Sequence, residues 1–115
     1  AAQVRADEMA ANTVYSHTRP DGRKYTTVTD CKYVGENIHR IADWALQGKP
    51  VSEVAMWSWN HSAGHQNNLL DKSYAEIGVG LARGVNEDGY ECWYCVQLFL
   101  WNGYSVSWVD APAAK

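Results

Sequence analysis

Residues 75–101 read AEIGVGLARGVNEDGYECWYCVQLFLW, and this stretch decides the fold. From residue 75 every second side chain is apolar, which is the period of a β-strand, so Ile77, Val79 and Leu81 would share one face. Residues 84–89 then contain two glycines with Asn and Asp, and residues 90–101 are rich in aromatic and other β-favouring side chains. The pattern predicts an antiparallel hairpin with residues 84–89 as its loop.

The cysteines of the second strand constrain any disulfide. Cys92 and Cys95 lie an odd number of positions apart, so they point to opposite faces of a strand, and a bridge between them would break it. If either is bridged, Cys31 is the better partner. Three cysteines allow one internal disulfide and leave one thiol over, so the redox compartment stays open.

The remaining elements follow outward from the hairpin. Residues 1–12 are rich in Ala, Glu, Arg and Met without Gly or Pro and predict a helix. Residues 14–30 predict a loop with a tight turn at 19–22, where Pro and Gly set the backbone angles. Residues 33–38 predict a short strand, and residues 51–61, which follow a proline, a second helix.

Composition indicates one globular domain. The chain has 115 residues, of which 46% are hydrophobic and 20% charged, and we predict a domain over residues 1–110 with a tail at 111–115. A formal charge of −3 argues against a nucleic-acid partner, because binding to phosphates relies on positive charge. The apolar runs are far shorter than the ~20 residues of a membrane span, so no transmembrane segment is expected.

Considered one at a time, the histidines and Glu36 can each be explained without a functional site. His17, in a loop, would be solvent-exposed or bonded to backbone, and His39 would lie on the surface. Glu36 would be a cap or a solvated side chain. The spacing of His61 and His65 is that of a zinc peptidase helix, but Ser62 stands where that motif needs Glu. The chain also lacks a Gly-x-Ser-x-Gly nucleophile elbow and a glycine-rich phosphate loop.

Several short motifs taken together resemble one family. In chain order they are residues 16–22 (SHTRPDG), 35–38 (GENI), Trp59 with Ser62, Gly64 and His65 with Asn68 and Leu70, 77–80 (IGVG) and 96–99 (VQLF). This order is similar to that of bacterial members of the CAP superfamily, or SCP domain, which includes cysteine-rich secretory proteins, insect antigen 5 and plant pathogenesis-related proteins. The helix over residues 1–11 also resembles the family's helix ahead of the His motif.

The resemblance implies an α+β fold, a three-layer α-β-α sandwich with a central, mostly antiparallel sheet. Bacterial members usually have a further helix ahead of the position of Ala1, so we expect a domain that lacks the family's first helix. Exposed apolar surface where that helix would pack is expected to favour self-association.

The resemblance also implies a cleft that holds two histidines and acidic residues. Carried over by position, His17 and His65 match the cleft histidines and Glu36 matches the glutamate of the Gly-Glu-Asn motif, whereas Ser62 stands in place of a second glutamate. Two imidazoles and a carboxylate suit Zn²⁺ better than Ca²⁺ or Mg²⁺, with an open position for water or ligand. The alternative is a His–Glu–His hydrogen-bond network that holds no metal.

Three functions compete on this basis. The leading hypothesis is a secreted or cell-surface CAP domain that binds a small ligand, lipids included, or an extracellular protein partner through His17, Glu36 and His65. The second is a zinc-dependent hydrolase of peptide, cell-wall or ester substrates, in which a metal-bound water is the nucleophile. The third is a purely structural surface domain. Ser62 leaves no second carboxylate for proton transfer, which favours binding over hydrolysis.

Overall fold

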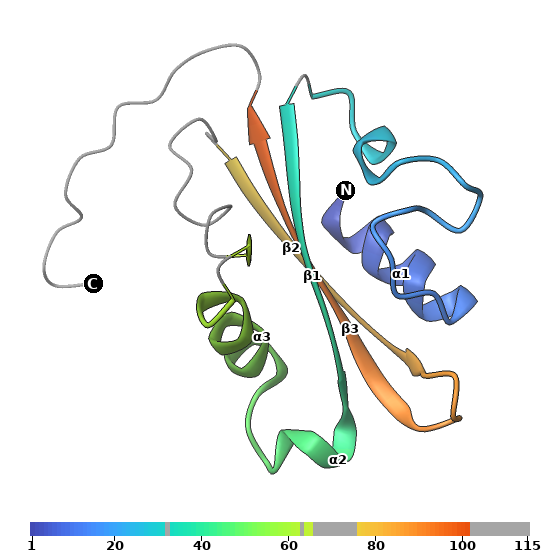
Figure 1. Ribbon diagram of the computed structural model, residues 1–115, viewed down its shortest axis with the longest axis vertical. Helices are drawn as coiled ribbons and strands as arrows, with labels where there is room; N and C mark the ends of the chain where they lie inside the picture. Colours follow the sequence, from blue (N-terminus) through green and yellow to red (C-terminus); the bar gives the residue numbers. More distant parts are fainter. Residues whose placement is uncertain (32, 63, 66–75, 102–115) are drawn as a thin grey trace, which may run out of the picture.

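The computed structural model describes residues 1–31, 33–62, 64–65 and 76–101, and this part forms three layers (Figure 1). The central layer is an antiparallel sheet in the order β1-β3-β2, built from β1 (Tyr33–Ala42), β2 (Glu76–Val85) and β3 (Glu91–Trp101). Helix α1 (Ala2–Asn12) covers one face, and α3 (Val51–Asn60) crosses the other. The predicted α-β-α arrangement is confirmed.

Small residues on β2 allow α1 to approach the sheet closely. A Cβ atom built on Gly80 would lie 2.5 Å from the backbone of Ala2 and Gln3, so only glycine fits there. Ala2, Ala6 and Met9 of α1 are buried against the sheet, with the aliphatic and aromatic side chains of β3 beneath them. Gln3 also pairs with the edge of β2, where its side-chain amide accepts from the N–H of Leu81 and donates to its carbonyl.

Alternation along β3 places its cysteines as predicted. Cys92 lies in the core under α1, and Cys95 lies in the core under α3. Cys31 was expected as a partner only if Cys92 or Cys95 were bridged, and in the structure all three cysteines are free. Cys31 precedes the end of β1 that pairs with Trp101, whereas Cys92 pairs with Ala42, nine residues and about 30 Å further along the strand. Burial raises the pKa of the Cys95 thiol to about 12, so it stays protonated at neutral pH.

The strand boundaries correct the expected ones. β1 runs on past residue 38 to Ala42, because its pairing with β3 continues through His39 and Arg40 although their side chains interrupt the apolar pattern. β2 continues to Val85, so the turn comprises residues 86–90 rather than 84–89. The Asn86 carboxamide oxygen holds this turn by accepting from the backbone N–H of Asp88 and Tyr90.

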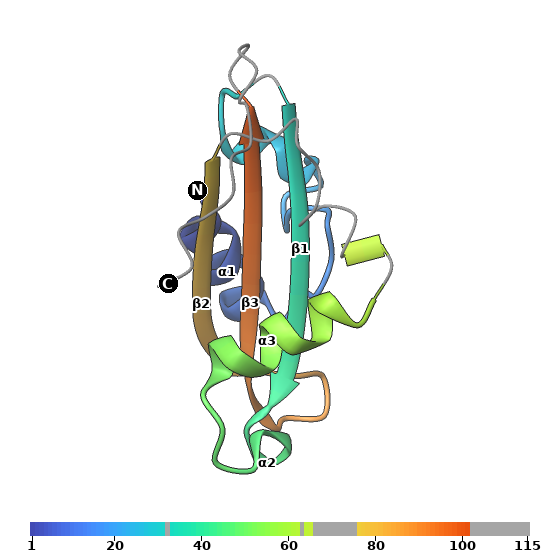
Figure 2. The ribbon, with the colours of Figure 1, turned by 90° about the vertical axis from the view of Figure 1, so that its left-hand side faces the viewer.

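The helices on the far face follow β1 along the chain. Of these, the short α2 (Asp43–Leu46) was not predicted, whereas α3 matches the expected helix to within one residue. The 3₁₀ turn η1 (Tyr25–Val28), which precedes β1, was not predicted either. Ala55 and Trp59 of α3 are buried against Cys95, and Figure 2 shows α3 lying across the strands. No helix within the described ranges is long and apolar enough to cross a membrane.

Candidate functional site

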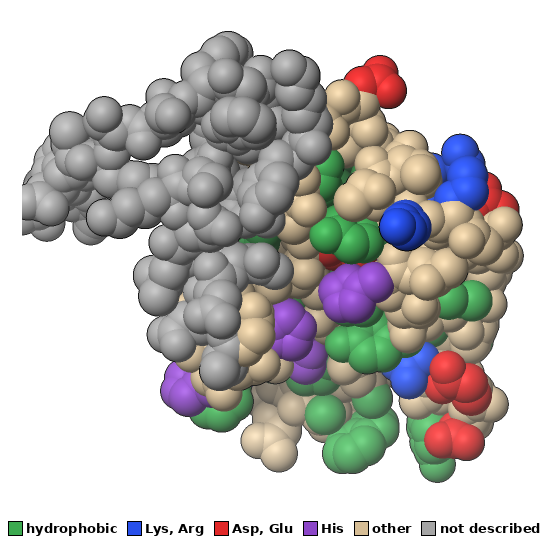
Figure 3. Space-filling view, turned by 45° about the horizontal axis from the view of Figure 1, so that its top comes forward, with side chains coloured by type: hydrophobic (Ala, Val, Ile, Leu, Met, Phe, Trp, Pro, Cys, Tyr) green, Lys and Arg blue, Asp and Glu red, His purple; other side chains and the backbone are tan. Residues whose placement is uncertain are grey.

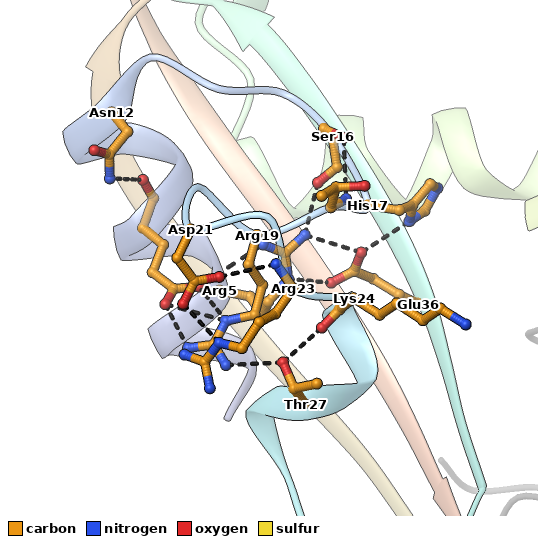
Figure 4. A network of polar contacts seen from close by, with 12 residues as sticks. Arg5, Asn12, Ser16, His17, Arg19, Asp21, Arg23, Lys24, Thr27 and Glu36 are labelled. Atoms are coloured by element: carbon orange, nitrogen blue, oxygen red, sulfur yellow. Dashed lines mark hydrogen bonds and ion pairs between the residues drawn. The ribbon is translucent and has the colours of Figure 1, made fainter.

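The site is centred on Glu36, which projects from β1 toward α1 (Figure 4). Its carboxylate is fully buried and forms a two-point ion pair with Arg5 of α1, whose side chain is also fully buried. Arg5 Nε donates to Oε2 at 2.7 Å, and Nη2 donates to Oε1 at 3.1 Å. Two charge-assisted hydrogen bonds compensate the carboxylate for lost hydration. The sequence-based interpretation of Glu36 as a cap or a solvated side chain is therefore wrong.

His17 completes the contact from the loop that follows α1. Its Nδ1 lies 2.8 Å from Glu36 Oε1, while 53% of its side chain is exposed to solvent. An ionised carboxylate only accepts hydrogen bonds, so Nδ1 carries the hydrogen. In the neutral ring the lone pair is then on Nε2. The hydrogen bond orients the imidazole ring and leaves the lone pair of Nε2 on the side of the ring away from Glu36.

Arginine side chains hold the loop in place against α1 and η1. Arg5 Nη2 donates to the carbonyl of Ser16 at 2.7 Å, directly before His17. Arg19 donates to both carboxylate oxygens of Glu8 and to the hydroxyl of Thr27 (Figure 4). The tight turn after Arg19 closes as predicted, with Gly22 at a φ of +91°. His17 is thus positioned by contacts on both sides of it.

His65 approaches from beyond the end of α3. Its carbonyl accepts from the Asn37 side chain at 3.1 Å, and Asn37 also donates to Gln97 Oε1 at 3.2 Å. Nδ1 of His65 is buried and has no hydrogen-bond partner among the described residues. Burial lowers the pKa of the imidazole, and the charge of neighbouring His17 lowers it further. A lowered pKa favours the neutral ring, which is the form that binds a metal.

His17 and His65 lie near enough for the charge of His17 to lower the pKa of His65, although their partners Glu36 and Asn37 face opposite sides of the sheet. β1 is an edge strand, and side chains from both layers close its edge at Ile38. The Ile38 carbonyl accepts from the Tyr15 hydroxyl at 3.2 Å and from Trp59 Nε1 at 3.1 Å. In the space-filling view, histidine side chains gather on one face of the molecule (Figure 3).

The predicted zinc ligands were His17, Glu36 and His65, and their placement can be compared with what coordination requires. Among the described residues, no group of three His, Cys, Asp or Glu side chains is placed to hold a metal ion. Glu36 already receives hydrogen bonds from Arg5 and His17, so it suits an outer role better than direct coordination. His17 Nδ1 is likewise engaged with Glu36, whereas His65 Nδ1 has no hydrogen-bond partner in the part of the chain that the structure describes.

The other two histidines lie apart from this contact. His39 is half-buried rather than on the surface: its Nδ1 lies 3.4 Å from the Ser58 hydroxyl. Burial lowers its pKa, and the charge of His65 adds to that effect. His61 does not join His65 in a zinc-peptidase pair, because its Nδ1 bonds the Trp57 carbonyl at 2.7 Å and its ring stacks on the Trp57 indole.

Sequence reasoning missed Arg5, the residue that holds the site together. The spacing of the buried residues Ala2, Arg5, Ala6 and Met9 is that of one helical face. An arginine within the apolar face of a helix needs a buried partner of opposite charge. The position of Arg5 within the apolar face of α1 could therefore have indicated that this helix contributes a charge to the site.

Comparison with known proteins establishes the class. The sequence profile of CAP, the Cysteine-rich secretory protein family, matches residues 1–99. The chain therefore belongs to the CAP family, as its motifs indicated. No curated protein and no solved structure gives a significant match to the chain.

Proposed function

We propose that this CAP domain is an extracellular binding domain that holds a divalent cation, zinc by its donor chemistry, between His17 and His65 and takes up a small ligand there. The observation that carries the proposal is the 2.8 Å contact between His17 Nδ1 and Glu36 Oε1. A histidine ligand commonly donates its other ring N–H to a carboxylate, which fixes its tautomer and raises its basicity.

Each side chain has a distinct part in the proposal. His17 would bind through Nε2 and His65 through an imidazole nitrogen, because borderline nitrogen donors suit zinc. Glu36 orients His17 from the outer shell, and Arg5 fixes Glu36. A bound zinc ion would supply open coordination positions for a donor atom of the ligand.

The same contacts favour binding over hydrolysis. A general base must be able to accept a proton from the attacking water. Glu36 is fully buried, and the guanidinium of Arg5 occupies both of its carboxylate oxygens. Ser62, at the place of the family's second glutamate, offers only a hydroxyl. Neither side chain is suited to take up that proton.

The experiment is a zinc titration by calorimetry on the wild type and on His17→Ala and His65→Ala, at about pH 7.5 and about pH 5.5. Protonation near the ordinary imidazole pKa of about 6.5 should weaken binding at the lower pH. We expect one-to-one binding that both substitutions abolish. His61→Ala is the matched control, because it removes an exposed imidazole that is engaged with Trp57.

Two results would contradict the proposal. One is no zinc binding by a wild type that unfolds cooperatively. The other is binding of equal strength in the wild type and in both site variants. Either result would mean that the hydrogen bond between His17 and Glu36 has only a structural role, connecting the loop after α1 to β1.

A further inference from the structure

A hollow of about 270 Å³ lies between α2 and α3, on the side of the sheet opposite α1. We call it the α2–α3 hollow. Its apolar wall includes Leu46, Val54 and the indole of Trp57. Its volume is slightly below the ~300 Å³ at which pockets for drug-sized ligands begin, which suits a ligand of one or two rings.

Trp57 provides a rigid aromatic surface at this hollow. Although it is a large apolar residue, 63% of it is exposed. The His61 ring stacks on it at a centroid distance of 3.9 Å and an interplanar angle of 16°. His61 is itself fixed, because its Nδ1 donates to the Trp57 carbonyl at 2.7 Å. The indole is thus supported in one orientation before any ligand arrives, which reduces the entropic cost of stacking on it.

Three polar side chains complete the lining. They supply an amide, an ammonium and a carboxylate, from Gln47, Lys49 and Glu53. Within the described part of the chain, none of the three side chains has a hydrogen-bond or ion-pair partner. The two charges are opposite, so the lining as a whole is neutral. It offers both donors and acceptors to a ligand that makes many hydrogen bonds.

We propose that the α2–α3 hollow binds a neutral saccharide, with one sugar ring stacked on Trp57. The C–H groups on one face of a pyranose make that face apolar, and their partial positive charge suits the negative face of an aromatic ring. The hydroxyl groups around the ring then meet the polar lining.

Other classes of ligand match only part of the lining. An acyl chain could cover the apolar wall but would make no hydrogen bond with Gln47, Lys49 or Glu53, which are exposed and would keep their water. A singly charged ligand of either sign would meet attraction from one of Lys49 and Glu53 and repulsion from the other. An uncharged polyhydroxylated ring can use both the apolar wall and the polar side chains, which is why the proposal commits to this class of ligand.

The test uses two neutral probes, triacetylchitotriose and cellotriose, with sodium dodecanoate as the apolar comparator. Binding is measured by saturation-transfer difference NMR and by calorimetry. We expect at least one sugar to bind, and Trp57→Ala to weaken its binding about tenfold or more, as expected when an aromatic stacking contact is lost. Trp44→Ala is the matched control, because Trp44 is 73% exposed on α2 but does not line the hollow.

Further variants separate this site from the zinc site and from a folding defect. His17→Ala and chelator treatment should leave sugar binding unchanged, since neither touches the hollow. Lys49→Met and Glu53→Gln, both at exposed positions, should each weaken sugar binding while the protein stays folded. The proposal is overturned if neither sugar binds, if binding survives Trp57→Ala undiminished, or if dodecanoate alone saturates the hollow.

Discussion

The guanidinium of Arg5 and the carboxylate of Glu36 form a fully buried ion pair, with Nε and Oε2 2.7 Å apart, that joins α1 to β1. The same carboxylate holds His17, and the same guanidinium holds the Ser16 carbonyl. One pair of charges therefore sets both the docking of the first helix and the position of the site. Because both groups have lost their water, removing either leaves the other uncompensated.

Replacing Arg5 should destabilise the fold strongly. Arg5→Met keeps much of the side-chain volume but leaves the Glu36 carboxylate buried without its cation. We expect a loss of about 3–5 kcal/mol in the free energy of unfolding, measured by urea denaturation.

The control is an exposed pair of the same type. Arg23 Nε donates to Asp21 Oδ2 at 2.6 Å, but both side chains are at least half exposed. Arg23→Ala should therefore change the urea midpoint little. An Arg5→Met variant as stable as Arg23→Ala would show that the buried pair is not what joins α1 to the sheet.

Glu36→Gln should distinguish an outer-shell role from direct coordination. The glutamine keeps a side-chain oxygen that can accept from His17 but loses the negative charge. If Glu36 acts from the outer shell, zinc affinity should fall about 10–100-fold. His17→Ala, in contrast, should abolish binding. Loss of all binding in a folded Glu36→Gln protein would identify Glu36 as a direct ligand; circular dichroism checks the fold.

The sequence predicted the layers better than the contacts between them. The alternation in residues 75–101 predicts the hairpin, because a half-buried strand repeats every second residue. The extension of β1 through His39 and Arg40 depends on pairing with β3, which is far away in the sequence. Local patterns carry no information about such a partner, so the expected strand ended too early.

In the candidate site, too, the sequence indicated which residues take part but not their tertiary contacts. His17 and Glu36 were singled out through the family's motifs, and the structure brings them into contact. The half-burial of His39 against Ser58 results from the crossing of α3 over β1, a tertiary relationship. The resemblance includes the helix over residues 1–11 only as a helix, without a motif of named residues, so it did not indicate that Glu36 is paired with Arg5.

Gly80 should be the least replaceable residue of β2. A methyl group there would lie 2.5 Å from the backbone of α1, so Gly80→Ala must push the helix away from the sheet. We expect a loss of about 1–3 kcal/mol, as for other overpacked positions, and a lower thermal midpoint.

Gly78 offers a matched control two residues earlier on the same face of β2. A Cβ atom there would meet only the Ala2 side chain, at an ordinary 3.7 Å. Gly78→Ala should be neutral or slightly stabilising, because alanine is less costly than glycine to order in a strand. Equal effects of the two substitutions would mean that α1 does not depend on the close approach at Gly80.

His39 should make the protein less stable in mild acid. Its pKa is lowered in the folded protein by burial first and by the charge of His65 second, so the folded state binds a proton less readily than the unfolded chain. The free energy of unfolding should therefore decrease as the pH falls below the ordinary imidazole value of about 6.5. His65, whose pKa is also lowered, contributes with the same sign.

His39→Gln removes one titrating group, so unfolding in urea at pH values between about 7 and about 5 should show a weaker pH dependence than in the wild type. His61→Gln, at an exposed position, provides the comparison. A pH dependence unchanged in His39→Gln would show that the proton uptake on unfolding arises elsewhere.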